Sequence, residues 1–220
     1  MTRILVVDDH SFVRKGIRET LAEAMDLLSI EEAADGSQAL EMLRSRAYDL
    51  AIIDISMPGK DGLALMKDAL ATNSALRFLV MSVYPEREYA ERAYRSGAMG
   101  YLGKSSLPGE FLDAVGRILG GRTYVGAEYA ELLVRRSLRG EARSPDPGGG
   151  NQGQALLSDR EFAVLRLFAE GKSLTLIGRD LNLSVKTVST YKTRVMEKLG
   201  IGTNAELVAY ALSHGLISPS

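Results

Sequence analysis

Along the first 120 residues, short apolar segments alternate with helical segments, and this alternation constrains the fold more than any other feature. The apolar segments are 3–7, 27–33, 49–54, 76–82 and 98–102. The segments with amphipathic helical spacing are 11–25, 37–45, 62–70, 86–96 and 108–119. Short buried strands that alternate with helices are typical of α/β domains, so we expect a doubly wound, five-stranded parallel sheet.

A Pro- and Gly-rich segment, SPDPGGGNQG at 144–153, ends this pattern, and its composition is that of a flexible linker. Only helical segments follow, at 157–171, 173–182, 184–200 and 203–215. Ser158 and Glu161 have the spacing of a capping box at the first of them. We therefore expect an α/β domain at 1–123, a linker helix (127–138) and flexible linker within 124–155, and a small all-α domain at 156–220.

The composition is that of an ordinary globular protein, with 45% hydrophobic residues and a net charge of -1. No apolar run approaches the ~20 residues of a membrane span, and the first strand begins too early for a signal peptide. The chain has no Cys and two His, which argues against disulfides and a zinc site. These features predict a cytoplasmic protein with no membrane partner.

Polar side chains stand at the carboxyl end of four of the five predicted strands. Asp8 and Asp9 end the first strand, Asp54 the third and Ser82 the fourth, and Lys104 follows the fifth. Ligands of such sheets bind at this edge. A single Asp here is usually a cap or turn residue, but three carboxylates together suit Mg²⁺, and a Lys and a hydroxyl suit an anion beside it. The set predicts a phosphoryl group carried on one carboxylate.

The segments VVDDH, IIDISMPGKDGL, VMSVY and GAMGYLGKS resemble the receiver domain of two-component response regulators, a flavodoxin-like (CheY-like) fold, over roughly residues 2 to 120. The resemblance implies that Asp54 accepts a phosphoryl group from a sensor histidine kinase. It also implies that Asp9, Asp54 and the backbone carbonyl of Ser56 bind Mg²⁺ directly, with Asp8 acting through a metal-bound water.

The same resemblance gives roles to three further residues. Lys104 would pair with the phosphoryl oxygens, and Ser82 would move toward the phosphoryl group. Tyr101 would then turn inward to fill the space that Ser82 leaves. Such a pair is a two-state element that a local change of charge can bias.

The helical segment 184–200 has an apolar face and an opposite face of small polar and basic residues. Between Ser184 and Gly200 it carries four basic residues against Glu197, and 155–220 has eight Lys and Arg against six Asp and Glu. Such a helix can pack inward and read a major groove, but an ordinary amphipathic surface helix has the same pattern.

The neighbouring motifs favour the groove-reading interpretation. LSDRE, GKS, IGRDLNLS, KTVSTY, KLG and AELVAYA resemble the helix-turn-helix domain of the LuxR/FixJ/NarL type across residues 156 to 212. Gly178 stands where that family more often has Ala. The resemblance makes 184–199 the recognition helix and the last helix a dimerisation surface, carried by Leu207 and Val208. We predict that Ser189, Thr190 and Thr193 contact base edges. The residues predicted to contact phosphates are Lys172, Lys186, Thr187, Lys192 and Arg194.

Together the resemblances predict a phosphorylation-activated transcriptional regulator that binds a double-stranded DNA operator as a homodimer, with RNA polymerase as a further candidate partner. We expect no enzyme activity beyond its own phosphorylation and dephosphorylation. One alternative is a dimeric DNA-binding regulator that needs no phosphorylation. Another is a Mg²⁺-dependent phosphohydrolase, although DIS at 54–56 lacks the second Asp of a DxD nucleophile motif.

Overall fold

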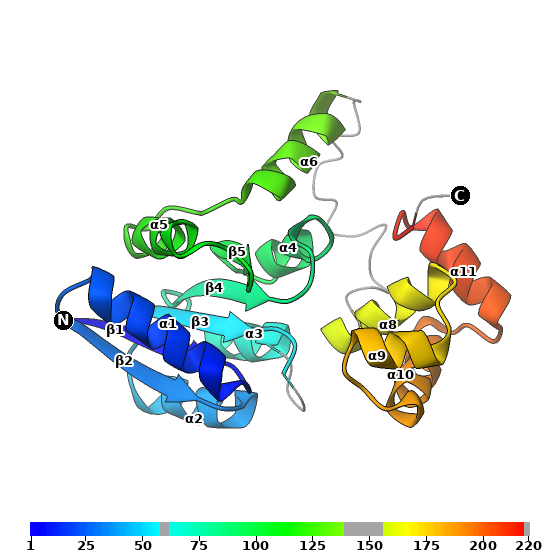
Figure 1. The fold of residues 1–220 in the computed structure, drawn as a ribbon, viewed down its shortest axis with the longest axis horizontal. Helices are drawn as coiled ribbons and strands as arrows, with labels where there is room; N and C mark the ends of the chain where they lie inside the picture. The colour runs from blue at the N-terminus through cyan, green and yellow to red at the C-terminus, as the bar shows by residue number, and fades with distance from the viewer. Residues whose placement is uncertain (58–61, 139–155, 218–220) are drawn as a thin grey trace. The chain divides into compact units, whose positions relative to one another are not determined.

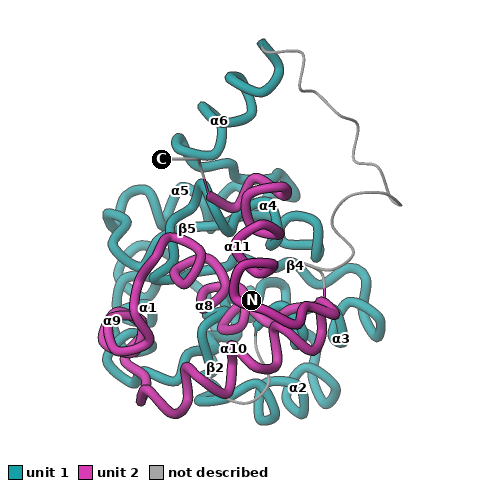
Figure 2. Tube along the Cα trace, turned by 90° about the vertical axis from the view of Figure 1, so that its right-hand side faces the viewer, with its two compact units in different colours: residues 1–142 teal, residues 143–220 magenta. Residues whose placement is uncertain are grey.

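The computed structural model describes residues 1–57, 62–138 and 156–217 of the 220-residue chain. The chain divides between residues 142 and 143 into two compact units (Figure 2). The predicted flexible linker at 144–153 lies outside the described residues. In the described part of the chain, no helix is both long enough and apolar enough to cross a membrane.

The first unit contains a parallel sheet with the strand order β2-β1-β3-β4-β5, which confirms the predicted fold class (Figure 1). Its strands are β1 (Thr2–Val7), β2 (Leu28–Ala33), β3 (Leu50–Asp54), β4 (Arg77–Ser82) and β5 (Gly100–Gly103). Its helices are α1 (Ser11–Ala24), α2 (Gly36–Ser45), α3 (Gly62–Thr72), α4 (Glu86–Arg95), α5 (Pro108–Leu119) and α6 (Ala127–Leu138).

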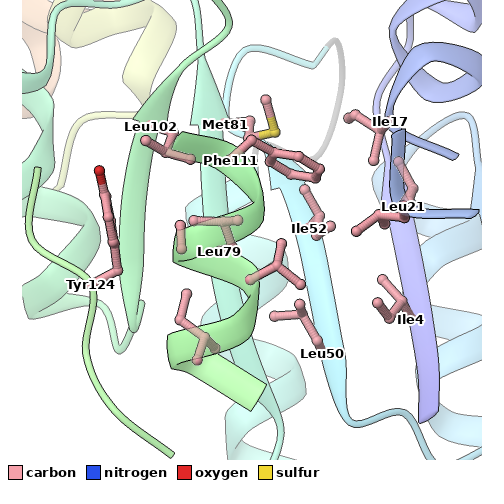
Figure 3. Close-up of a cluster of buried hydrophobic side chains, with 14 residues drawn as sticks. Ile4, Ile17, Leu21, Leu50, Ile52, Leu79, Met81, Leu102, Phe111 and Tyr124 are labelled. Atoms are coloured by element: carbon pink, nitrogen blue, oxygen red, sulfur yellow. The ribbon is translucent and has the colours of Figure 1, made fainter. Parts of the chain in front are cut away.

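The central strands are buried on both faces, as their continuous apolar sequences require. On one face, α1 and α5 cover the sheet (Figure 1). Ile17 and Leu21 of α1 and Phe111 of α5 pack against strand residues such as Ile52 and Leu79 (Figure 3). This packing fixes β1, β3 and β4 relative to one another, and so fixes the positions of the residues at their carboxyl ends.

Helix α6, which the sequence assigned to the connection between the domains, packs against α4 within the first unit. The rings of Tyr94 and Tyr129 stack with their centroids 5.4 Å apart. Arg136 donates to a Glu91 carboxylate oxygen at 2.7 Å, across 45 positions of sequence. The Tyr94 hydroxyl also donates to the backbone carbonyl of Tyr124 at 2.8 Å. These contacts hold α6 on α4, while the predicted domain boundaries stay a prediction.

The first residue of α4, Glu86, lies against the residue that precedes α6. A Cβ atom at Gly126 would overlap the Glu86 carboxylate, so any larger residue here would force that side chain to shift. Burial, with the nearby Glu128 and Glu110 carboxylates, raises the pKa of Glu86 to about 7, although backbone N–H groups of Tyr129 and Gly126 act to lower it. The contact between α4 and α6 therefore contains a carboxyl group that titrates near neutral pH.

The second unit consists of α8 (Asp159–Ala169), α9 (Leu174–Asp180), α10 (Val185–Leu199) and α11 (Asn204–Ser213), which confirms the predicted helical domain. The capping box of Ser158 and Glu161 is present at the start of α8. Val164, Leu167, Ile177 and Val188 form a core between α8, α9 and α10. At Gly178, a Cβ atom would lie 2.7 Å from the Leu183 carbonyl oxygen, so the α9–α10 turn here approaches closer than Ala allows.

Candidate functional site

Two buried carboxylates lie side by side at the carboxyl edge of the sheet. Asp8 directly follows β1 and Asp54 ends β3, and these strands are paired in register up to Val7 and Ile53. Both aspartates are only 2% exposed. The Lys104 amino group, which follows β5, lies 2.6 Å from Asp8 Oδ2 and 2.7 Å from Asp54 Oδ2. The structure thus places two of the predicted carboxylates against the predicted lysine.

The electrostatics of this group favour a further positive charge. Burial raises the pKa of Asp54, and the nearby Asp8 adds to this, although Lys104 and the Ser56 N–H group lower it. Burial alone would lower the pKa of Lys104, but the two carboxylates outweigh it and raise that pKa. Lys104 is therefore charged, and its single charge is shared between two buried carboxylates. The pocket as a whole is short of positive charge.

Asp9 lies at the mouth of the pocket, and its neighbour His10 belongs to the same group. His10 Nδ1 is 2.8 Å from Asp9 Oδ1 and 3.2 Å from Asp8 Oδ1, and the His10 N–H group donates to Asp8 Oδ1 at 2.8 Å. One ligand atom from each of Asp8, Asp9, His10 and Asp54 lies within 4.8 Å of the others. The sequence reasoning missed His10 at this site, although its position directly after Asp9 is the signal that could have found it.

Carboxylate oxygens from three aspartates are the donor set that Mg²⁺ prefers, so the residues present fit this ion. Ser56 is placed for a supporting role, since its N–H group donates to Asp54 Oδ1 at 2.8 Å and holds the carboxylate in a fixed orientation. The imidazole of His10 is not a ligand that Mg²⁺ requires, and it is 62% exposed.

The predicted switch residues are both fully buried beside the pocket. Ser82 Oγ accepts a hydrogen bond from the Tyr84 N–H group at 3.1 Å. The Tyr101 hydroxyl donates to the Tyr84 carbonyl at 2.9 Å, so both residues contact the backbone of the same residue. Tyr101 is thus already inside in this structure, where the sequence reasoning expected it to turn inward only on phosphorylation. Its movement stays a prediction.

In the second unit, α10 presents most of the residues predicted to contact DNA. The exposed ones among them are Lys186, Ser189, Thr190, Thr193 and Arg194, while Thr187 is half-buried. Ser184 caps the helix, and its Oγ accepts from the Thr187 N–H group at 3.1 Å. The helix therefore has the exposed small polar and basic face that a groove-reading helix needs.

Two of the predicted phosphate contacts already have partners within the unit. Lys172 pairs with Asp180 at 2.7 Å. The Lys192 amino group lies 4.4 Å from the centre of the Phe168 ring, in a cation–π contact. Lys186 and Arg194 are exposed, and we expect them to be the more readily available cations.

The two residues predicted for dimerisation differ in exposure. Leu207 is fully buried inside the unit, where it packs as part of the core, so a partner subunit cannot reach it in this conformation. Val208 is half-buried and keeps part of its side chain accessible. Of these two residues, only Val208 remains a candidate for a dimer contact.

Comparison with known proteins assigns both units. Residues 4–116 match the response regulator receiver domain, and residues 155–211 match the luxR family of bacterial regulatory proteins. The chain is 31% identical to the response regulator UvrY of Escherichia coli K12 over 98% of this chain and 96% of that protein. It is 35% identical to the transcriptional activator protein ExaE of Pseudomonas putida over 97% of each.

A solved structure supports the same assignment. RcsB of Salmonella enterica serovar Typhimurium, bound to the promoter rprA in the presence of the phosphomimetic BeF₃⁻, matches with a TM-score of 0.56 and 28% identity, covering 95% of this chain and 97% of that one. The family matches and the full-length relatives agree with the geometry of both units. The chain therefore belongs to the two-component response regulators of the NarL/FixJ type, the phosphorylation-activated, DNA-binding transcriptional regulators that join a receiver domain to a LuxR-type helix-turn-helix.

Proposed function

We propose that Asp54 is the phosphoacceptor of this regulator. The observation that carries the proposal is the Lys104 amino group held against both Asp54 and Asp8 in a buried pocket. In the reaction, a carboxylate oxygen of Asp54 forms a bond to the phosphorus atom of a phosphohistidine on a sensor kinase. The bond from phosphorus to the imidazole nitrogen breaks, and its electron pair stays on that nitrogen.

The surrounding residues stabilise the charge that this transfer brings into the pocket. Asp8, Asp9, Asp54 and the Ser56 carbonyl would hold Mg²⁺, which supplies positive charge to the phosphoryl oxygens. Lys104 exchanges its contact with Asp54 Oδ2 for a phosphoryl oxygen. Ser82 gives up the Tyr84 N–H group and donates its hydroxyl to another phosphoryl oxygen. This loss of a contact to Tyr84 passes the change to the segment that leads into α4.

Exposed apolar side chains around the pocket support docking of a protein phosphodonor. Phe12 is 89% exposed, Leu107 is 74% and Val83 is 67%. Phe12 follows Asp9 by three positions, Val83 follows Ser82 directly, and Leu107 follows Lys104 by three. Large apolar side chains that are this exposed have no packing role in the monomer and are typical of a protein interface.

We further propose that phosphorylation favours a homodimer that binds two DNA half-sites through α10, inside the cytoplasm where its operator lies. RNA polymerase is a further candidate partner once the dimer is on DNA. Short side chains on α10 support modest direct readout, with the remaining specificity coming from DNA shape and half-site spacing. The only chemistry in this proposal is self-modification, namely formation and slow hydrolysis of the Asp54 phosphate.

The proposal is tested by intact mass and by DNA binding, each with and without acetyl phosphate and Mg²⁺. The parent chain should gain one phosphoryl group and bind DNA more tightly. Asp54→Asn should lose both responses, while the surface control Asp113→Asn keeps them. A full gain in DNA affinity with Asp54→Asn would overturn the proposal.

The same experiment distinguishes this proposal from the rival hypothesis, a regulator that binds DNA without phosphorylation. The buried position of Tyr101 in this structure is the observation that favours that rival. Tight DNA binding by the parent chain, unchanged by acetyl phosphate although Asp54 becomes phosphorylated, would support it.

A further inference from the structure

The exposed threonines of α10 have their hydroxyl protons turned toward their own helix. Thr190 Oγ1 donates to the Lys186 carbonyl at 3.0 Å, and Thr193 Oγ1 donates to the Ser189 carbonyl at 3.1 Å. Each threonine has a single O–H proton, so neither has a donor left for a ligand. What each can offer outward is an acceptor lone pair and the γ-methyl group.

The two threonines share one side of α10. They lie three residues apart, about 60° around the helix axis and ~4.5 Å along it, so both methyl groups can face the same groove. Val185, in the first turn of α10, is also 46% exposed. At 100° per residue it lies about 140° around the helix from Thr190, so it is on a different side.

We propose that Thr190 and Thr193 make this protein's base readout depend on the C5-methyl groups of thymine. The inference rests on the proposed function, in which α10 lies in the major groove. The thymine methyl is the only apolar group on the base edges of that groove, and it is the natural partner of side chains that present methyl groups. The rival is that the threonine lone pairs accept from adenine or cytosine amino groups.

The first experiment removes the methyl group from the DNA. The full chain, treated with acetyl phosphate and Mg²⁺, selects its tightest duplexes from a randomised library, and each thymine in turn is replaced by deoxyuridine. Substitution at the contacted positions should weaken binding about fourfold per methyl group lost from a buried contact. Substitution outside the half-sites should have no effect.

The second experiment removes it from the protein. Thr193→Ser deletes the methyl and keeps the hydroxyl, whereas Thr193→Val keeps a methyl and deletes the hydroxyl. Thr193→Ser should bind the thymine and deoxyuridine duplexes equally at one position per half-site, and Thr193→Val should still discriminate. Thr72→Ser is the matched control, because Thr72 on α3 is also exposed and donates to the carbonyl four residues earlier.

The outcomes separate the inference from the proposed function. If the parent chain selects no duplex, the proposed function fails and the inference with it. If it selects duplexes but treats thymine and deoxyuridine alike at every position, only the inference is overturned. The rival, in which the threonine lone pairs accept from amino groups, also predicts no such discrimination. Discrimination that survives unchanged in Thr193→Ser would show that the Thr193 methyl group does not carry the readout, and would overturn the inference at this residue.

Discussion

The phosphorylation pocket keeps two of its charged side chains buried, whereas the exposed face of α10 keeps its charged side chains in water. In the pocket, Asp8 and Asp54 are held out of water, and each lies within 2.7 Å of the Lys104 amino group. On α10, the exposed Lys186 and Arg194 stay in water, where a charge costs little. The comparison teaches that a pocket residue acts on folding and function together, whereas an α10 residue can act on binding alone.

The largest effect is expected from Lys104→Met, which leaves two buried carboxylates without their cation. Loss of one partner from a buried charge group should lower the free energy of unfolding by about 3 kcal/mol. Urea denaturation of the full chain in a chelating buffer measures it, with the exposed Lys67→Met as control. An unchanged unfolding midpoint would mean that the pocket behaves like the surface of α10, and the comparison would fail.

The next effect concerns the carboxyl group at the α4–α6 contact. Gly126→Ala adds a methyl group where the Glu86 carboxylate lies, so this side chain must shift and the α4–α6 contact should weaken by about 1 kcal/mol. Hydrogen exchange over 127–138 reports the weakening. Gly116→Ala, where a Cβ atom meets nothing within 4 Å, is the matched control. Equal exchange in the two variants would show that α6 is not held in this way.

Lys186→Ala tests the opposite half of the comparison. The free energy of unfolding should change by less than ~0.5 kcal/mol, because the side chain is exposed. DNA binding should weaken across all sequences, and the slope of log affinity against log salt should fall by about 1. Titrations at several salt concentrations measure both quantities. A marked loss of stability would show that this lysine also has a structural partner.

A further effect at the α4–α6 contact is a pH dependence of stability. The pKa of Glu86 is raised in the folded state to about 7 from an ordinary 4.5, so folding favours its protonated form. That contribution is fully present below about pH 4.5 and is lost as pH rises through about 7. Between pH 5 and 8, Glu86→Gln should reduce the fall in first-unit stability with rising pH, whereas the exposed Glu131→Gln should not. Parallel profiles for parent and Glu86→Gln would contradict the assignment.

The sequence was sufficient to predict the position of a residue where that position follows from the topology of the sheet. Parallel strands bring their carboxyl ends to one edge, so Asp8, Asp54 and Lys104 could be placed together before any contact was known. The helix bounds followed from spacing and caps such as Ser158, and they agree with the structure to within two residues at most ends.

The sequence was insufficient to predict side-chain contacts where the partner residue belongs to another helix or strand. The pairing of Lys172 with Asp180 and of Lys192 with Phe168 depends on how α8, α9 and α10 pack. The inward position of Tyr101 and the burial of Leu207 likewise depend on neighbours that no local pattern specifies. The docking of α6 on α4 rests on pairs such as Glu91 and Arg136, which are far apart in the chain.

The docking of α6 also sets the length of the tether between the two units. Twenty residues, 139–158, separate Leu138 from the start of α8. Tyr124 stays in the core of the first unit, so release of α6 would add the 14 residues from 125 to 138. For the flexible linker that the composition of 144–153 predicts, lengthening from 20 to 34 residues costs about 0.5 kcal/mol of closure entropy, roughly a twofold drop in the effective concentration of one helix-turn-helix near its dimer partner. A single carboxylate at Glu86 could thus adjust how readily a receiver dimer engages two half-sites at once.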